Sequence, residues 1–294
     1  MTDALILWPG SRGLLRIEGP DSRAFLQGIV SNDVNKVSPA RAVYAALLTP
    51  QGKYLYDFFI AELGGALIVD CEAARRDDLL RRLARYKLRS KVAIEAAAPE
   101  LAVALVYGAE ALLALGLPPE RGAAKAFAGG VVYTDPRLVE IGARAILPRA
   151  AATAVAGAGL RPGSPADYDS LRIRLGLPDG SRDLEIEKSL LLENGFDELA
   201  GVDWDKGCYM GQELTARTHY RALVKKRLVP VDIDGPPPAP GTPIMADGAE
   251  AGVMRSSSDG MGLALLKREA LDGTQSLTAG AAKLAPRVPA WLKS

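Results

Sequence analysis

The sequence reads VYAALL at residues 43–48, TPQG at residues 49–52 and YLYDFFI at residues 54–60. The two outer runs are apolar and aromatic, which is typical of β-strands, and the segment between them holds a proline and a glycine, which tight turns favour. We therefore predict a β-hairpin here. A further strand is expected soon after it, at residues 67–71.

Short strands and helices are mixed on both sides of this hairpin. Asp21 precedes an apolar stretch at helical spacing, and residues 73–86 place leucines at helical spacing among arginines that we interpret as a solvated surface. Strands and helices do not alternate regularly, so we predict an α+β fold rather than a doubly wound sheet. The other expected strands are at residues 5–7, 13–17, 92–94, 102–106, 130–133 and 143–147, and a helix is expected at residues 168–175.

The character of the sequence changes at Arg227. Short alternating runs follow at residues 228–233, 251–255 and 262–267, and turn-forming pairs such as Asp247-Gly248 and Asp259-Gly260 separate them. We interpret this region as a small antiparallel β-barrel of about 65 residues. The predicted domains are a body of two subdomains at residues 1–226 and a C-terminal barrel at residues 227–294.

Composition limits the classes of function. The 294 residues are 48% hydrophobic, and a formal charge of +1 gives no overall field for attracting nucleic acid or an acidic membrane, so neither is expected as a partner. No P-loop, no G-x-G-x-x-G after a strand and no H-E-x-x-H occurs, which argues against common nucleotide and zinc-hydrolase sites. No apolar run approaches the roughly 20 residues of a spanning helix, and residues 1–10 lack signal-peptide features. We therefore expect a cytoplasmic protein.

The two cysteines stand in different contexts. Cys208 lies in the run KGCYMGQE at residues 206–213, where Lys206 and two glycines favour a thiolate over the ordinary thiol with its pKa of about 8.5. A cysteine that served packing alone would be expected in an apolar run, so we predict that Cys208 is accessible and reactive. Cys71 ends an apolar strand and is predicted to be a core residue. Neither a disulfide scaffold nor a metal site is expected.

Basic residues and one histidine follow this run. His219 is a candidate base for a Cys208 nucleophile, as a thiol hydrolase requires, although the sequence singles out no acid to orient it. The alternative for His219 is a polar surface position or an anion contact. The basic cluster from Arg217 to Arg227 is either a solvated strand edge or a receptor for a carboxylate-bearing ligand.

The run at residues 206–213 also resembles the K-G-C-Y-x-G-Q-E signature of the YgfZ family, and LTARTH at 214–219 is similar to the mitochondrial iron–sulfur maturation branch of that family. Towards the N-terminus, three runs resemble landmarks shared with the glycine-cleavage T-protein. The three runs are FLQG at 25–28, SNDV at 31–34 and QGK at 51–53. Farther along the chain, Asp135-Pro136-Arg137 also looks like a family position.

This resemblance implies a T-protein-like (GcvT-like) fold, with a folate-binding, aminomethyltransferase-like body around a central channel and a C-terminal antiparallel β-barrel. It further implies a tetrahydrofolate-binding accessory protein for iron–sulfur cluster assembly or repair that uses the Cys208 thiol. The expected cofactor is tetrahydrofolate or a one-carbon derivative, and the expected partners are folate and iron–sulfur client or assembly proteins. One cysteine cannot hold a four-iron cluster, so no permanently bound metal or cluster is expected.

Candidate folate contacts follow from the chemistry of the ligand and from the signature. Pterin edges need paired donors and acceptors, and the glutamyl tail needs cations. With Cys208 as the catalytic candidate, the folate-binding candidates are Asn32, Asp33, Lys53, Asp57, Lys206, Tyr209, Gln212, Glu213 and Arg217.

One departure from the wider superfamily concerns enzyme activity. Where T-proteins carry paired aspartates, this chain has Tyr56-Asp57, so one of the two carboxylates is missing. Aminomethyl transfer depends on a carboxylate near the folate nitrogens. We therefore expect an accessory factor without classical transferase activity, and a folate-dependent aminomethyl or methyl transferase is the alternative. Asp57 either bonds the pterin or has a plain structural role.

Overall fold

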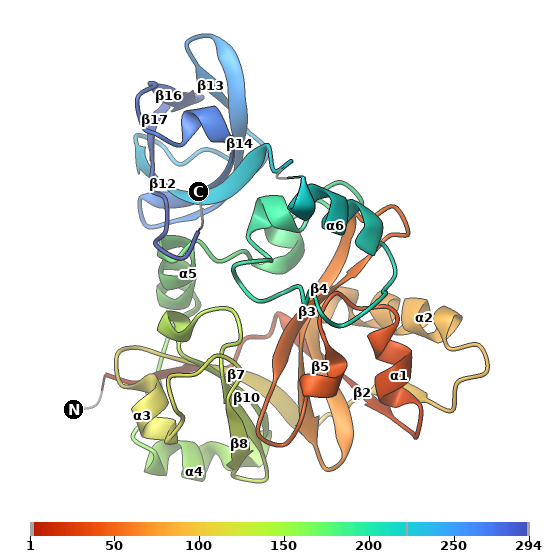
Figure 1. Ribbon diagram of the computed structural model, residues 1–294. Coiled ribbons are helices and arrows are strands. Elements are labelled where there is room, and N and C mark those ends of the chain that lie inside the picture. The colour runs from red at the N-terminus through yellow and green to blue at the C-terminus, as the bar shows by residue number, and fades with distance from the viewer. Residues whose placement is uncertain (1–2, 222, 293–294) are drawn as a thin grey trace. The chain divides into compact units, whose positions relative to one another are not determined.

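The computed structural model describes residues 3–221 and 223–292 (Figure 1). The chain forms two compact units whose segments interleave along the sequence. The first unit comprises Met1–Leu48, Leu55–Pro165 and Leu199–Met210, and the second comprises Thr49–Tyr54, Ala166–Glu198 and Gly211–Ser294. Cys208 therefore belongs to the first unit, whereas the end of its signature run belongs to the second.

A five-stranded sheet forms one layer of the first unit. Its order is β3-β4-β5-β2-β6, and the strands span Val43–Leu48, Tyr54–Leu63, Ala66–Glu72, Arg12–Glu18 and Ala93–Ala96. The predicted hairpin strands are confirmed as β3 and β4, and the strand expected at residues 67–71 is β5. β4 continues to Leu63, because the next turn is made by Gly64 and Gly65, which both adopt positive φ.

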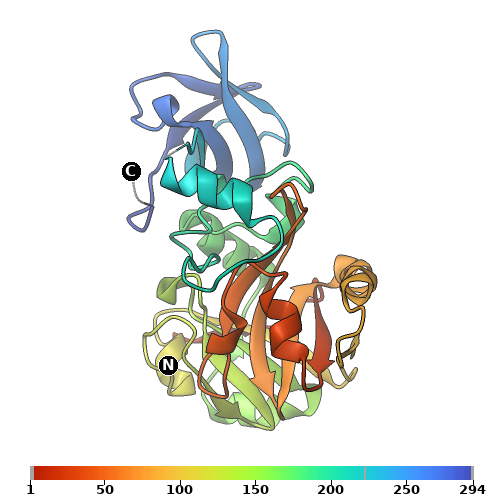
Figure 2. The ribbon, with the colours of Figure 1, turned by 45° about the vertical axis from the view of Figure 1, so that its right-hand side comes forward.

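Helix α2 (Arg76–Tyr86) packs on this sheet through one apolar face. Leu79 and Leu83 lie in the same buried cluster as Leu15 and Ile17 of β2, as their spacing of one helical turn predicts. The predicted solvated surface is confirmed only in part, because Arg81 and Arg85 are exposed whereas Arg75 is half-buried and donates to the Leu55 carbonyl. α2 is seen nearly end-on in Figure 2. The helical elements on this sheet are α1 (Ser22–Gln27), η1 (Val34–Lys36), η2 (Ala73–Arg75) and α2 (Arg76–Tyr86).

A six-stranded sheet forms the other layer of the first unit. Its order is β11-β1-β7-β10-β9-β8, and the strands span Arg161–Pro162, Leu5–Leu7, Leu101–Tyr107, Ala143–Pro148, Gly130–Thr134 and Ala124–Phe127. The strands pair antiparallel except for β1 with β11. The short helices attached to this sheet are α3 (Ala111–Leu115), η3 (Val139–Ile141), η4 (Arg149–Ala151) and α4 (Ala152–Gly157).

The second unit contains a closed antiparallel barrel. Its order is β12-β15-β14-β13-β16-β17, and the strands span Lys226–Asp234, Met261–Lys267, Ala249–Ser258, Pro243–Ala246, Leu277–Ala279 and Ala282–Pro286. Asp247-Gly248 and Asp259-Gly260 all adopt positive φ, as the central pair of a type I′ hairpin requires. The predicted barrel is confirmed. The other elements are α5 (Pro165–Arg174), η5 (Gly180–Arg182), η6 (Leu192–Asn194), α6 (Gln212–Tyr220) and η7 (Arg268–Ala270).

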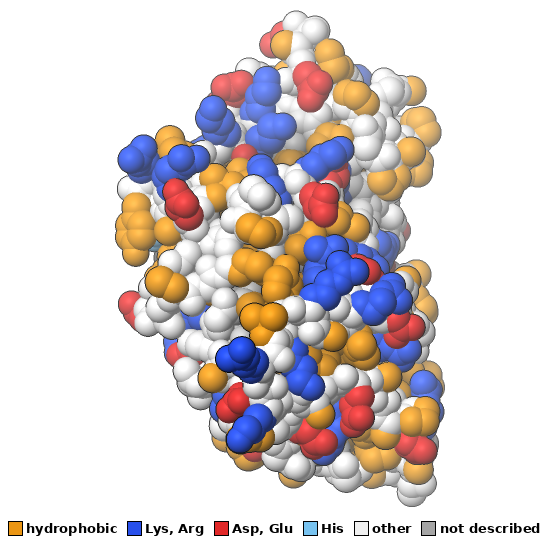
Figure 3. Space-filling model, turned by 90° about the vertical axis from the view of Figure 1, so that its right-hand side faces the viewer, with side chains coloured by type: hydrophobic (Ala, Val, Ile, Leu, Met, Phe, Trp, Pro, Cys, Tyr) orange, Lys and Arg blue, Asp and Glu red, His pale blue; other side chains and the backbone are white. Residues whose placement is uncertain are grey.

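The surface carries mixed charges. Figure 3 shows Lys and Arg side chains interspersed with Asp and Glu over one face, which agrees with the formal charge of +1. Within residues 3–221 and 223–292, no helix combines the length and apolar character that crossing a membrane would require.

Candidate functional site

Cys208 is exposed on a loop of the first unit that leads towards α6. Gly207 before it adopts a φ of +87°, and a Cβ at that position would meet nothing within 4 Å. The left-handed backbone explains the glycine, and the open surroundings leave the sulfur accessible. The accessibility predicted for Cys208 is thus present, while its reactivity stays a prediction.

The end of α1 anchors this loop. The Lys206 ammonium donates to the carbonyl oxygen of Gln27 at 2.8 Å and also to that of Val30. Gln27 returns a hydrogen bond from its amide nitrogen to the Lys206 carbonyl at 3.2 Å, and the Met210 N–H donates to the Gly28 carbonyl at 3.1 Å. Sequence reasoning did not assign Gln27 a role, although it lies in one of the family landmarks.

Lys206 is partly buried, and this burial lowers the pKa of its ammonium group. Burial lowers the pKa of Lys206 to about 8, against the opposing effect of Asp33 and Asp203. The ammonium also lies 5.0 Å from the ring centroid of buried Tyr209, within the range of a cation–π interaction. Lys206 and Tyr209 therefore hold the loop in place beside the exposed thiol, and a folate contact by either residue stays untested.

Asn32 and Asp33 bond to backbone groups of β3, of η1 and of the segment that leads to the Cys208 loop. The buried Asn32 amide donates to the carbonyl oxygens of Tyr44 and Ala200, each at 2.7 Å, and its oxygen accepts from the Asp33 N–H at 2.7 Å. The Asp33 carboxylate accepts from the N–H of Asn35 and so caps η1. These bonds give both side chains a structural role, and their predicted folate contacts stay untested.

Asp57 lies in a buried polar environment on β4. Its side chain accepts a hydrogen bond from the Tyr44 hydroxyl at 2.9 Å. Burial, followed by the charge of Asp57, holds the pKa of Tyr44 well above its usual range, so the phenol stays protonated and donates. The guanidinium of Arg137 lies 5.5 Å from the Tyr44 ring centroid and pairs with Asp135 at 3.0 Å. Asp135 and Arg137 of the predicted landmark therefore lie near Tyr44, the residue that donates to Asp57.

Buried charges continue from there between the two sheets of the first unit. Asp70 on β5 is fully buried and pairs with Arg12 of its own sheet at 2.7 Å and with Arg144 of β10 at 2.6 Å. Burial acts to raise the pKa of Asp70, but the two guanidinium groups outweigh it and hold the pKa below its usual range. Sequence reasoning missed these three residues. The available signal was a charged residue inside an apolar strand, since such a charge needs a partner.

The remaining folate candidates belong to the second unit. Lys53 lies in the turn after β3, and its charge opposes the rise that burial causes in the pKa of half-buried Glu193. α6 begins with Gln212 and Glu213, and Arg217 is exposed near its end. We considered that the basic cluster from Arg217 to Arg227 forms a solvated strand edge. This is wrong for its first residues, because α6 continues to Tyr220 and β12 begins only at Lys226.

His219 has the acidic partner that the sequence did not identify. Its Nδ1 lies 3.2 Å from a carboxylate oxygen of Asp197 within the second unit. Such a pair can orient an imidazole, so the thiol-hydrolase alternative stays an untested hypothesis. Within the part of the chain that the structure describes, no three His, Cys, Asp or Glu side chains are grouped as metal ligands.

Comparisons with known protein families match both ends of the fold. The family described as "GCVT N-terminal domain" matches residues 11–116, and the family described as "CAF17, C-terminal beta-barrel domain" matches residues 225–294. Aminomethyltransferase T of the glycine cleavage system from Bartonella henselae superposes with a TM-score of 0.78 at 16% identity, covering 99% of this chain and 86% of that one. The predicted T-protein-like fold with a C-terminal barrel is confirmed.

Curated relatives match nearly the whole chain. The human protein "Iron-sulfur cluster assembly factor IBA57, mitochondrial" is 36% identical over 304 residues, covering 95% of this chain and 83% of that protein. The mouse protein of the same name is 34% identical over 286 residues, covering 89% and 77%. These names agree with the predicted link to iron–sulfur cluster assembly, and they replace YgfZ with IBA57 as the family name.

The prediction of a cytoplasmic protein is wrong by this comparison, because both relatives are named as mitochondrial proteins. It rested on the first ten residues, the near-neutral charge and the lack of a spanning run. Net charge and the length of apolar runs carry no information on the compartment in which a protein works.

Proposed function

Because the chain belongs to the IBA57 family of iron–sulfur cluster assembly factors, we propose that it is an accessory protein of iron–sulfur cluster assembly or repair whose working group is the Cys208 thiol. The observation that carries this proposal is the exposed sulfur on a loop that is anchored on both sides. Two residues before Cys208, Lys206 bonds to the Gln27 carbonyl at the end of α1, and two residues after it the Met210 N–H bonds to the Gly28 carbonyl. A thiol held in this way is presented to another protein or to a cluster.

Cys71 provides a contrast within the same unit. It is 1% exposed, and burial raises the pKa of its thiol to about 12, so it stays protonated at neutral pH. A protonated, enclosed thiol is neither a nucleophile nor an iron ligand. Of the two cysteines, Cys208 is the one available for chemistry.

The proposed chemistry is transient ligation. The Cys208 thiol would release its proton to solvent and donate a sulfur electron pair to one iron of a cluster, since thiolates are the soft ligands that such iron accepts. A four-iron cluster takes four such ligands, so the other ligands would come from the client or from an assembly protein. The cluster is then cargo, and a client cysteine that replaces Cys208 completes the transfer.

We also infer that tetrahydrofolate binds beside Asp57 and Tyr44. The buried Asp57 carboxylate accepts from Tyr44, and because a carboxylate can accept more than one hydrogen bond, it can also accept from an N–H group of a pterin edge. The transferase alternative has less support, because Tyr56 stands where T-proteins carry a second acid and its hydroxyl donates to Asp78. Folate would then regulate or stabilise the protein rather than turn over.

The experiment compares Cys208→Ala with Cys71→Ala in cells that lack the endogenous factor. We expect Cys208→Ala to leave the activity of a four-iron client enzyme at the level of cells without the protein, and Cys71→Ala to restore it. Binding of tetrahydrofolate, measured on the purified proteins, should be unchanged by Cys208→Ala. Full client activity with Cys208→Ala would refute the role of this thiol.

A further inference from the structure

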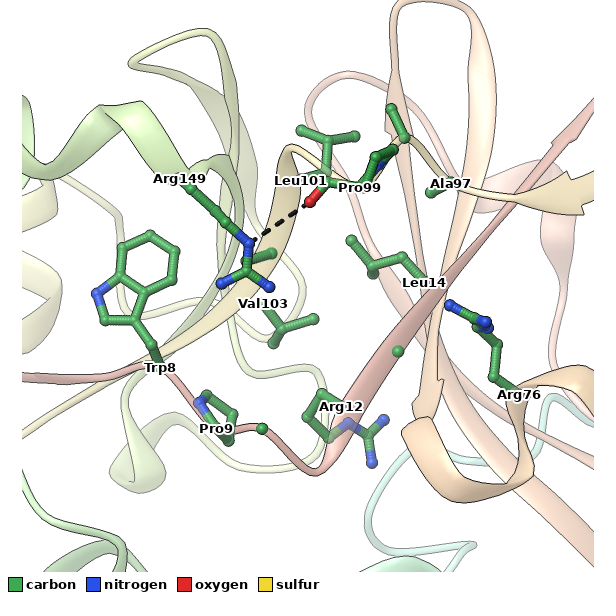
Figure 4. A pocket seen from close by; sticks show the side chains of 14 residues that line it. Trp8, Pro9, Arg12, Leu14, Arg76, Ala97, Pro99, Leu101, Val103 and Arg149 are labelled. Carbon is green, nitrogen blue, oxygen red and sulfur yellow. Dashed lines mark hydrogen bonds between the residues drawn. The ribbon is translucent and has the colours of Figure 1, made fainter.

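A cavity of about 300 Å³ lies in the first unit, away from the Cys208 loop (Figure 4). Trp8 and Pro9 follow β1 on one side of it, Arg12 begins β2, Arg76 begins α2, and Arg149 follows β10. The volume is at the lower end of the range for small-molecule sites, which is about 300–1,000 Å³. The cavity has room for a ligand larger than a single inorganic ion.

Three arginines line this cavity, and no acidic residue does. Figure 4 shows their guanidinium groups around the space, with Leu14 and Val103 between them. Arg12 pairs with Asp70 at 2.7 Å behind the wall, and Arg76 pairs with Asp77 at 2.8 Å on the surface. Neither carboxylate lines the cavity, but each compensates part of the charge of its arginine.

Of the three arginines, Arg149 has the positive charge that is least compensated by a neighbouring carboxylate. Its Nε donates to the Pro99 carbonyl at 3.5 Å, and within the described residues it forms no ion pair. Because only the Nε–H takes part in this long hydrogen bond, the terminal N–H groups of the guanidinium can donate to a ligand. Figure 4 shows its guanidinium turned towards the cavity.

We propose that this cavity binds a small phosphomonoester. Arg76 and Arg149 come from different elements, so their guanidinium groups can bond different oxygens of a tetrahedral phosphate, whereas a carboxylate has only two oxygens in one plane. The remaining lining is apolar or glycine and includes Trp8, Leu14 and Val103, which suit the organic part of the ester. None of these residues lies in the Cys208 loop or beside Asp57, so this site is separate from the function proposed above.

Isothermal titration calorimetry on the full chain tests this site. The probes are ribose 5-phosphate, AMP, inorganic phosphate and succinate. We expect at least one ester to bind more tightly than inorganic phosphate, and succinate not to compete with it. Arg149→Ala should weaken ester binding about tenfold to hundredfold, because it removes a charge-assisted hydrogen bond. Arg89→Ala removes the same charge from the α2–β6 loop of the same unit, outside this cavity, and should leave binding unchanged.

A second pair of variants changes the shape of the cavity without changing its charge. A Cβ at Gly10 would meet nothing within 4 Å, so Gly10→Ala should fold and bind as the wild type does, whereas Gly10→Leu should fill part of the cavity and weaken binding. Wild-type affinity in both Arg149→Ala and Gly10→Leu would overturn the location. Equal affinity for inorganic phosphate and the esters, tighter binding of succinate, or no binding of any probe at millimolar concentration would overturn the ligand class.

Discussion

Asp70→Asn tests the buried ionic network that joins the two sheets of the first unit. Asp70 is fully buried and accepts from Arg12 at 2.7 Å and from Arg144 at 2.6 Å. Asparagine has nearly the same shape but no charge, so both guanidinium groups would stay buried without their shared carboxylate. Removing one partner of a buried ion pair costs about 3–5 kcal/mol.

The expected loss lies at the lower end of this range, about 3 kcal/mol, for two reasons. Asparagine keeps one oxygen that can accept a hydrogen bond, and Arg144 retains Asp135 at 3.8 Å. A domain is typically stable by about 5–15 kcal/mol in total, so this loss is large. Urea denaturation of the wild type and the variant gives the free energy of unfolding, and Glu120→Gln is the control.

The control removes a carboxylate from an exposed pair, in which Glu120 lies 3.0 Å from Arg41. Such pairs contribute about 0–1 kcal/mol. The reasoning fails if Asp70→Asn costs no more than Glu120→Gln, because the buried guanidinium groups would then not depend on this carboxylate.

The same variant has a defined pH dependence. The pKa of Asp70 is held below its value in the unfolded chain, which is about 3.9, so the unfolded state binds the proton first as the pH falls. The stability advantage of the wild type over Asp70→Asn is therefore complete above about pH 4 and shrinks below it. An advantage that grew towards low pH would contradict the assigned direction.

Two further predictions concern the loop and the folate site. Burial lowers the pKa of Lys206 to about 8, below the unfolded value of about 10.4, so the unfolded chain binds the extra proton between these values. The stability of the wild type relative to Lys206→Met should rise with pH across this window, and a flat difference in urea denaturation would argue against a buried ammonium. Asp57→Asn should weaken tetrahydrofolate binding about tenfold or more in a fluorescence titration, because it removes a charged acceptor. Unchanged affinity would place the pterin elsewhere.

Local patterns were enough to predict most of the secondary structure. The hairpin at β3 and β4 follows from two apolar runs around a proline and a glycine, and the barrel turns follow from Asp-Gly pairs. These signals lie within a few residues of one another, so neighbouring side chains encode them directly. The basic run that starts inside α6 at Arg217 was harder to assign, because a charge-rich run has no apolar period that distinguishes helix from strand.

The exposure of Cys208 was also predicted from its neighbours, because a run of glycine and polar residues has no apolar face to bury. The partners of Lys206 could not be predicted in this way. Its charge was expected to serve the adjacent thiol, whereas the fold directs the ammonium to the carbonyl oxygen of Gln27, 179 positions away in the sequence. Sequence proximity to a cysteine does not decide where a flexible side chain finds its acceptors.

The sequence by itself determined the strands, the turns, the α+β class and the polar setting of one cysteine, since each depends on backbone geometry and on the spacing of apolar residues. Only the tertiary structure decided which buried charges meet. Asp70 pairs with Arg12 and Arg144 across strands from different parts of the chain. A buried charge must find a partner, but the identity of that partner depends on which strands the fold brings together.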